Sequence, residues 1–397
     1  MALRYLTAGE SHGPLLVGIL DGLPAGIPVA ERDLVPRMKR RMGGYGRGKR
    51  MTFEADRPQI VGGTWKGETT GAPLAVLIEN RSNRQGRTTV RKTVPRPGHA
   101  DLAGMLKYGF SDANPVIERA SARETAMRVA LGAAACRLLE LAGARLAGHV
   151  IELGGISAAP CSEGAGHGTH DGSATSAARA ADRLERARDA SPVASADPAA
   201  SKAIMARIDE AVARGETLGG RVELIVWGLP PGLGSYVQHD RRLDARLAAA
   251  LAAIPSVKEV ELGDALAAGR SSGHEAHDVI ARAGDGLGRA SNRAGGLEGG
   301  VTNGQPLVAR LTLKPISTLR RPLPSVDLDT GRAVEGRYVR SDVTVVPAAT
   351  VIAEAVAGIV LADALLEKFG ADTLPELLAA LASYRGRLPR WPKGRNR

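Results

Sequence analysis

The chain has 397 residues, 44% of them apolar and 24% charged, which is an ordinary balance for a globular protein with one large core. Its 53 basic and 42 acidic side chains give a net charge of +11, which indicates either nucleic acid or a small polyanionic ligand as a partner. With only 3 Trp, 6 Tyr and 3 Phe, and no basic cluster interleaved with aromatic residues, the chain offers no stacking platform for single-stranded nucleic acid.

Cysteine content and the N-terminus indicate the compartment. Cys136 and Cys161 are too few for a disulfide framework, and this favours a reducing environment. The first residues, MALRYLTAGESHG, lack the basic and apolar regions of a signal peptide, and no run of about 18 uncharged apolar residues occurs. We therefore expect a cytoplasmic protein with no membrane and no nucleic acid as a partner.

The first part of the chain predicts short strands and one helix. Apolar runs bounded by glycine and proline predict strands at residues 3–8, 15–20 and 74–78, and helical spacing of apolar residues predicts a helix at 31–42. Four glycines between residues 43 and 50 let the backbone of the next loop approach a ligand, while Arg47 and Arg50 supply positive charge.

Residues 95–128 form the stretch around which the rest of the sequence is organised. Ser121 and Glu124 form a capping box, which predicts a helix start, and apolar residues continue at helical spacing to Leu141. A helix N-terminus offers amide groups and partial positive charge to an anion, although a capped helix alone is also typical of an ordinary surface. Three arginines surround this helix start and favour an anionic ligand: Arg119, Arg123 and Arg128.

The second half of the chain repeats the order of the first. Residues 220–232 match 14–26 at an offset of 206, residues 304–307 match 71–74 at 233, and residues 338–342 match 108–112 at 230. Helices are predicted after the first and last of these matches, at 241–254 and at 350–369, the latter with Gly370 as its C-cap. We predict one domain, 1–397, with two intertwined repeats of about 1–150 and 215–375. Chance similarity of short turns is the alternative.

Two segments carry no motif. Residues 158–200 are rich in Ala, Ser, Gly and Asp with little periodicity, which predicts a surface excursion, and a helix is predicted at 202–214. Residues 384–397 form a basic tail, which is typical of a solvated or disordered end.

Three short motifs match known sites only in part. GESHG at 9–13 has the spacing of a hydrolase nucleophile elbow, but an apolar strand follows where that elbow needs a helix. HEAH at 274–277 lacks the four-residue histidine spacing of a zinc-binding helix. GDGLG at 284–288 has its third glycine one position too early for a dinucleotide fingerprint. We interpret the last two as loops and expect no metal.

His12 and His99 lie in glycine-bearing turns near arginines. A histidine gives or takes a proton near neutral pH, and a bound polyanion stabilises its charged form among arginines. Either histidine alone would more often be structural. Together with the arginine loops they indicate acid chemistry on a phosphorylated, carboxylated small molecule, with an anion-binding module without chemistry as the other class.

Seven stretches, spread in order over nearly the whole chain, carry a family resemblance: TAGESHG (7–13), GGYGRGKRM (43–51), RPGHAD (96–101), RASARETAMRVA (119–130), NRAGGLEGGVTNGQP (292–306), KPIST (314–318) and RSDV (340–343). With them the chain resembles chorismate synthase. The resemblance implies an α+β fold, a β-α-β sandwich with helices between antiparallel sheets and two similar halves. It also implies a phosphate-eliminating carbon–oxygen lyase of the shikimate pathway, at the last common step of aromatic amino-acid biosynthesis.

The implied reaction is the anti-1,4-elimination of phosphate and the C6 proton from 5-enolpyruvylshikimate 3-phosphate, which gives chorismate and requires reduced FMN without net redox change. By this resemblance His12 protonates the departing phosphate, His99 serves the N1 and C2 carbonyl region of the flavin, and Asp342 near flavin N5 helps it take the C6 proton. Ser11 and Ser121 hold this network. The resemblance assigns substrate binding to four arginines: Arg41, Arg47, Arg50 and Arg123.

The resemblance also implies the flavin contacts and the partners. Proline has no amide hydrogen, so of the pair Pro255 and Ser256 only the serine can donate to the flavin. Relatives are usually homotetramers, and some reduce their flavin with NADPH; we expect a tetramer served by an external flavin reductase. The implied flavin contacts are Arg119, Ala120, Ser121, Pro255, Ser256, Gly299, Lys314, Pro315, Ile316, Ser317, Thr318 and Arg340.

Overall fold

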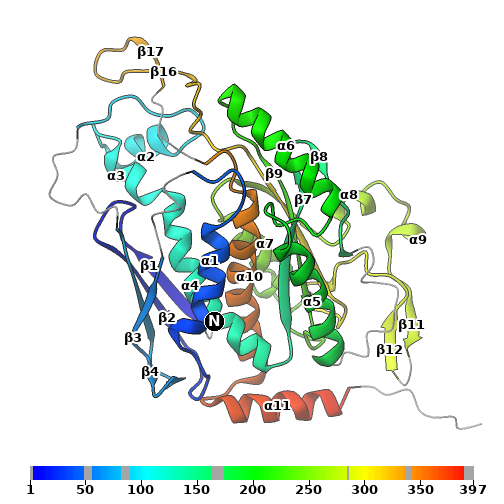
Figure 1. The fold of residues 1–397 in the computed structure, drawn as a ribbon. Coiled ribbons are helices and arrows are strands. Elements are labelled where there is room, and N and C mark those ends of the chain that lie inside the picture. The colour runs from blue at the N-terminus through cyan, green and yellow to red at the C-terminus, as the bar shows by residue number, and fades with distance from the viewer. Residues whose placement is uncertain are drawn as a thin grey trace, which may run out of the picture.

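The computed structural model describes residues 3–48, 56–81, 90–162, 174–283, 286–336 and 342–388. Two antiparallel sheets enclose a layer of long helices (Figure 1). The fold is α+β, and the predicted sandwich with helices between antiparallel sheets is confirmed.

The first sheet has the strand order β1-β2-β6-β3, with every neighbouring pair antiparallel. Buried and exposed positions alternate along β2, so that Leu16 and Leu20 face the helices while Ile19 faces outward. The strands predicted from apolar runs at 3–8, 15–20 and 74–78 correspond to β1, β2 and β6. The bounds are β1 (Arg4–Ala8), β2 (Leu15–Asp21), β6 (Leu74–Glu79) and β3 (Pro58–Gly62).

The second sheet has the order β10-β15-β9-β7-β8 and is also antiparallel. Its central strands are buried on both faces, because long helices cover the inner face and α5 (Ala174–Asp189) covers the outer one. The bounds are β10 (Val257–Leu262), β15 (Leu307–Leu313), β9 (Gly220–Trp227), β7 (Arg145–Leu153) and β8 (Ile156–Ser157).

The central strand pairs of the two sheets have the same pairing register when the repeat offsets are applied. In the first sheet Leu20 on β2 lies opposite Leu74 on β6. At the offsets read from the sequence, 206 and 233, these positions correspond to Val226 and Leu307, which lie opposite each other on β9 and β15. In each sheet a further antiparallel strand pairs on either side of this central pair. This register supports the proposed duplication, while the repeat boundaries stay a prediction.

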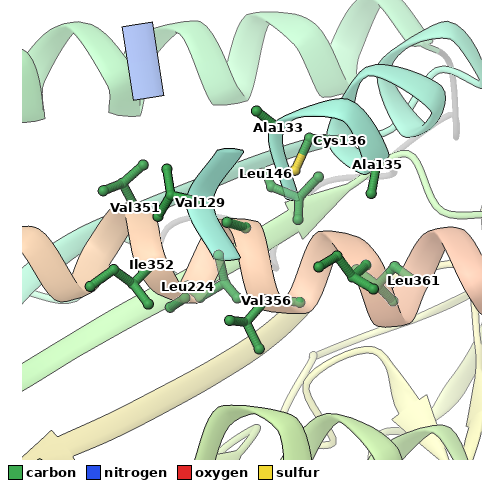
Figure 2. Packing of buried hydrophobic residues seen from close by; sticks show 14 of the residues in the cluster. Val129, Ala133, Ala135, Cys136, Leu146, Leu224, Val351, Ile352, Val356 and Leu361 are labelled. Atoms are coloured by element: carbon green, nitrogen blue, oxygen red, sulfur yellow. The ribbon is translucent and has the colours of Figure 1, made fainter. Parts of the chain in front are cut away.

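Three helices fill the space between the sheets: α1 (Glu31–Met42), α4 (Thr125–Leu141) and α10 (Val346–Phe369). α4 packs on the first sheet, α10 packs on the second, and the two helices pack on each other. Figure 2 shows this interface, where Val129 of α4 lies beside Val351 of α10, and Cys136 of α4 donates to the Glu354 carbonyl of α10 at 3.6 Å. The predicted helices at 31–42 and 350–369 are confirmed, and α10 begins four residues earlier than predicted.

α10 is long and apolar enough, by length and composition, to cross a membrane. Of its most apolar window, with a mean hydropathy of 2.0, 94% is buried inside the protein, as expected for a core helix. Within it Glu354 is fully buried and bonds to Arg40 and Arg188.

The remaining described elements surround this core. The helices are α2 (Asp101–Tyr108), α3 (Asn114–Arg119), α6 (Pro198–Arg214), α7 (Leu243–Ala252), α8 (Ala265–Ala268), α9 (Gly273–Ala276) and α11 (Leu374–Gly386), with 3-10 turns at Ala122–Glu124 and His239–Arg241. Four small hairpins complete the fold: β4 (Thr64–Trp65) with β5 (Glu68–Thr69), β11 (Ile280–Ala283) with β12 (Gly286–Arg289), β13 (Leu297–Glu298) with β14 (Val301–Thr302), and β16 (Pro324–Val326) with β17 (Ala333–Glu335).

The capping box predicted at Ser121 does not form. The Ser121 hydroxyl accepts from the amide of Arg123 at 3.3 Å and caps a 3-10 turn, and α4 begins only at Thr125. The Glu124 carboxylate accepts instead from the Thr7 hydroxyl and from Arg128, both at 2.9 Å. The Glu124 side chain is therefore bound by Thr7 and Arg128 and does not cap the helix.

Three other segments differ from the sequence expectations. Residues 158–200 contain α5, whose Ala177, Ala181 and Leu184 pack on the outer face of the second sheet. The start of the basic tail is ordered in α11, where the hydroxyl of Tyr384 donates to the Pro231 carbonyl at 2.9 Å; residues 389–397 lie outside the described part. The segments expected to be loops at 274–277 and 284–288 fall on the short helix α9 and, for the described residues from 286, on β12.

Candidate active site

A cavity of about 430 Å³ opens between the two halves of the chain, within the size range of ligand sites. Its walls come from the β1–β2 loop, the end of α1, the turn before α4, the loop after α7, the end of β15 and the start of α10. Fifteen residues predicted from sequence line it together: Ser11, His12, Arg41, Arg47, His99, Ala120, Ser121, Arg123, Pro255, Ser256, Lys314, Ile316, Ser317, Thr318 and Asp342.

Arg41 and Arg123 form a buried pair around one carboxylate. Asp56 contacts both guanidinium groups, Arg41 at 3.2 Å, and its own side chain is 1% exposed. The Nε and Nη2 of Arg123 also donate to the Asn80 side-chain oxygen at 2.9 and 2.8 Å. Burial lowers the pKa of Arg41 to about 10, so the group stays charged at neutral pH. With one carboxylate for two guanidinium groups, the pair keeps net positive charge toward the cavity.

Arg47 lies in the loop after the C-terminal end of α1 and forms a contact between the two repeats. Its Nη1 lies 2.7 Å from Oδ2 of Asp342, and the amide of Gly48 donates to Oδ1 of the same carboxylate at 2.6 Å. The glycine-rich loop after α1 therefore holds Asp342 through the charge of Arg47 and the backbone amide of Gly48. With Arg96 and Lys314 also in the wall, cationic side chains outnumber carboxylates among the described lining residues, and the cavity favours an anionic ligand.

His12 lies in the loop between β1 and β2 and is held by Glu118. The Glu118 carboxylate lies 2.9 Å from Nδ1 of His12 and accepts from its amide at 2.8 Å. Burial would raise the pKa of Glu118, but the contacts with His12 lower it overall. Next to it the Ser121 hydroxyl donates to that of Ser11 at 3.1 Å. The predicted serine network therefore borders the His12 loop.

His99 lies on a different part of the cavity wall from His12. It belongs to the segment 96–100, of which Arg96 also lines the cavity. Its Nδ1 lies 2.5 Å from a carboxylate oxygen of Asp101, a fully buried residue. Two imidazoles, each held at Nδ1 by a carboxylate, thus lie in the wall of one positively charged cavity. Such an arrangement supports proton transfer on a bound anion.

One wall of the cavity combines apolar and hydrogen-bonding groups. Ser256 has a positive φ of 73°, and its carbonyl accepts from the Lys314 amide at 2.9 Å, which ties the loop after α7 to the end of β15. Apolar side chains cover the same wall, among them Ile254, Leu313 and Ile352. An isoalloxazine ring needs flat apolar contact plus donors at its edge, and this set of residues, with the hydroxyls of Ser256, Ser317 and Thr318, fits such a ring.

Three predicted flavin contacts lie elsewhere. Arg119 donates to the carbonyl and hydroxyl of Thr7 at 2.9 and 3.0 Å, and neither it nor Pro315 is among the lining residues. Gly299 lies in the β13–β14 hairpin beside the first turn of α7, whereas Pro255 follows its last turn, a separation of about 15 Å along the helix. The predicted site residues Arg50 and Arg340 lie outside the described residues.

Four functional positions were not singled out from sequence. Asp56, Glu118 and Asp101 are the carboxylates that hold the arginines and histidines, and Arg96 lines the cavity. Two of them, Arg96 and Asp101, were visible as the first and last residues of RPGHAD. Glu118 lies within 95–128, one residue before the stretch RASARETAMRVA, and Asp56 lies in a segment without a local pattern.

None of the three partial motifs forms, among the described residues, the kind of site whose spacing it matches in part. GESHG joins two antiparallel strands, which differs from the strand-to-helix turn of a nucleophile elbow. No group of three or more His, Cys, Asp or Glu side chains suited to a metal occurs in the described ranges.

Comparisons with known proteins agree over nearly the whole chain. The family model described as chorismate synthase matches residues 3–366. The chorismate synthase of Chlorobaculum tepidum is 47% identical over 400 residues, covering 97% of this chain and 98% of the relative. That of Beutenbergia cavernae is 48% identical over 405 residues, covering 98% and 99%. A crystal structure of chorismate synthase is similar with a TM-score of 0.79 and 35% identity, covering 97% of this chain and 98% of the other.

Proposed function

The chain belongs to the chorismate synthase family of carbon–oxygen lyases, and from this we propose that it converts 5-enolpyruvylshikimate 3-phosphate to chorismate with reduced FMN. One observation carries the proposal. His12, His99 and Asp342, which come from segments far apart in the sequence, line one cavity rich in arginine.

The arginines supply substrate binding. The substrate carries one phosphate and two carboxylates, and guanidinium groups bind such anions through paired hydrogen bonds. Arg41 and Arg123 are fixed by Asp56 before any ligand arrives, so little side-chain freedom is lost on binding. Arg47 is the cavity arginine whose carboxylate partner, Asp342, itself lines the site.

Two side chains move the protons. His12, as imidazolium, gives a proton to the phosphate oxygen as the carbon–oxygen bond breaks, and Glu118 offsets its charge. Asp342 assists at the opposite end of the reaction, where the C6 proton leaves the ring for the base that the reduced flavin would supply. The electron pair of the C6–H bond forms a new double bond, the existing ring double bond shifts toward the carbon that loses phosphate, and the electrons of the broken carbon–oxygen bond leave with phosphate. The overall reaction involves no net oxidation or reduction.

The cofactor requirement is the second part of the proposal. Reduced FMN, when bound, supplies an electron-rich surface over the substrate and a base for the C6 proton. Ser256, Ser317 and Thr318 would hold its polar edge, Lys314 its negative charge, and His99 another edge of the ring.

The remaining parts of the proposal rest on composition and family resemblance. We propose a cytoplasmic homotetramer, because the chain has two cysteines and its relatives are usually tetramers. We also propose that an external flavin reductase supplies the reduced FMN.

An anaerobic assay tests the function directly. The purified full chain, given dithionite-reduced FMN and 5-enolpyruvylshikimate 3-phosphate, should produce chorismate, which is followed by its absorbance. Replacing His12 or His99 by Ala should lower turnover by about 10²-fold while ligand binding persists. Absence of chorismate from the wild-type protein with reduced FMN bound would support the anion-binding module instead.

A further inference from the structure

Asp101 lies behind the cavity wall and gathers four polar contacts. It is fully buried at the first residue of α2. Arg96 donates to it from its amide at 3.0 Å, from Nε at 2.8 Å and from Nη2 at 2.9 Å. The fourth contact is His99, whose Nδ1 lies 2.5 Å from Oδ1. Arg96 and His99 line the cavity, so Asp101 connects to the site only through them.

The charge of Asp101 determines which nitrogen of His99 carries hydrogen. Burial alone would raise the pKa of Asp101, but the contacts with Arg96 and His99 lower it far below its usual range. An ionised carboxylate only accepts hydrogen bonds, so Nδ1 of His99 must carry the hydrogen that lies between them. In the neutral ring Nε2 then carries none.

Arg96 contacts both members of this pair. Its Nη2 lies 3.0 Å from Nδ1 and 3.2 Å from Nε2 of His99. This nitrogen lies at similar distances from both ring nitrogens, so the contact with Asp101 alone assigns the tautomer. Arg96 therefore binds both the carboxylate and the imidazole and holds the three groups as one unit.

The unit of Arg96, His99 and Asp101 is held close to the cavity-lining segment 314–318. Lys314 Nζ donates to the carbonyl of Gly98 at 2.5 Å. Gly98 has a φ of +74°, and a Cβ there would lie 3.4 Å from Cβ of Ser317. His99 is thus attached to the same segment, 314–318, that borders the proposed flavin site.

We propose that Asp101 is the positioning residue of His99, which keeps hydrogen on Nδ1 and makes Nε2 the nitrogen that takes up and returns a proton in the cavity. A buried aspartate fixes the histidine of Ser-His-Asp triads in the same way, and its amide replacement produces the wrong tautomer. An O–H bond of the solvent donor breaks as the Nε2–H bond forms, Asp101 offsets the charge, and the Nε2–H bond breaks when the proton passes to its acceptor. The inference rests on the proposed function only for the destination of that proton, the reduced flavin.

Neutron diffraction from crystals of the deuterium-exchanged full chain, without ligand, tests this without any assay. At a pH where His99 is neutral, deuterium is expected on Nδ1 and absent from Nε2. Deuterium on Nε2 would overturn the proposal, even if the protein makes chorismate. Failure of the wild-type assay with a deuterium on Nδ1 would instead count against the proposed function alone.

Variants extend the test to the reaction. D101N should move deuterium to Nε2 and lower kcat by about 10²-fold with unchanged affinity for reduced FMN, while D101E should restore part of kcat. D112N is the matched control, because Asp112 accepts from the amides of Lys92 and Asn114 and holds no histidine. If D101N kept Nδ1 deuterated with normal kcat, Asp101 would have a structural role only. Should D101N not fold, the wild-type deuterium position decides alone.

Discussion

Asp342 and Arg47 face each other across the junction of the two halves, with Oδ2 of the carboxylate 2.7 Å from Nη1 of the guanidinium. The contact pairs a loop after α1 with the segment before α10. Both groups line the cavity, so an anionic ligand competes with Asp342 for Arg47. Ligand binding therefore changes the environment of the carboxylate that we place at the C6 proton.

Replacing Asp342 by Asn should separate binding from chemistry. The amide cannot hold or pass a proton, so kcat should fall by about 10²-fold. Arg47 loses its charged partner and becomes more available to the substrate, so KM should stay equal or fall. Steady-state kinetics with reduced FMN measures both. Asp209→Asn, which changes a surface carboxylate bonded to Tyr45, should leave both values unchanged, and an unaltered kcat in Asp342→Asn would contradict the assignment.

Glu118→Gln tests the support of His12. The substitution removes the negative charge that offsets the imidazolium but keeps an oxygen for the His12 amide. We expect kcat to fall by about tenfold, corresponding to about 1.4 kcal/mol, with substrate affinity maintained. Glu79→Gln, at the exposed end of β6, provides the control for loss of one negative charge. Equal kcat values for the two variants would show that Glu118 has no part in proton transfer.

Patterns along the sequence predicted the layers of the fold because each strand and helix has its own periodicity. The apolar run of β2, bounded by glycine and proline, and the largely apolar sequence of α10 are local signals. α5 has such a signal in Ala177, Ala181 and Leu184, spaced for one helix face, but its alanines give little contrast with the residues between them.

The carboxylates around the site could not be predicted in this way. Asp56 pairs with Arg41 and Arg123, and the latter is 67 residues away in the chain. Glu118 pairs with His12 across 106 residues. Such partners are chosen by the packing of distant segments, and no spacing in the sequence encodes them. The same cause misled the prediction at Ser121, where Glu124 bonds to Thr7 and Arg128.

A buried pair away from the cavity should make stability depend on pH. His149 and Glu223 lie opposite each other on β7 and β9, with Nε2 and Oε2 3.1 Å apart. Burial would lower the pKa of His149, but contacts with Cys161 and Glu223 raise it from 6.5 to about 9. Burial opposes and the contacts with His149 and Ser162 favour ionised Glu223, whose pKa falls to about 2 from 4.5.

The signs follow from these shifts. The His149 contribution is full below pH 6.5 and is lost as the pH rises through 9, whereas that of Glu223 is full above pH 4.5 and is lost toward pH 2. The free energy of unfolding should therefore fall by roughly 2–3 kcal/mol more in the wild type than in His149→Gln between neutral pH and alkaline pH. Urea denaturation of both proteins across this range measures the difference. Parallel curves would contradict the prediction.

Close contact between α4 and α10 requires glycine at position 132. A Cβ there would lie 2.5 Å from the Ala355 carbonyl oxygen and 2.6 Å from its Cβ, and backbone cannot move aside as a side chain can. Gly132→Ala should force the helices apart and lower the free energy of unfolding by about 1–3 kcal/mol, despite the higher helix propensity of alanine. Gly386→Ala is the matched control, because no atom lies within 4 Å of a Cβ at that end of α11. Urea denaturation should show a lower midpoint for Gly132→Ala and an equal or higher one for Gly386→Ala; equal midpoints for both variants would mean that the helix contact tolerates the methyl group.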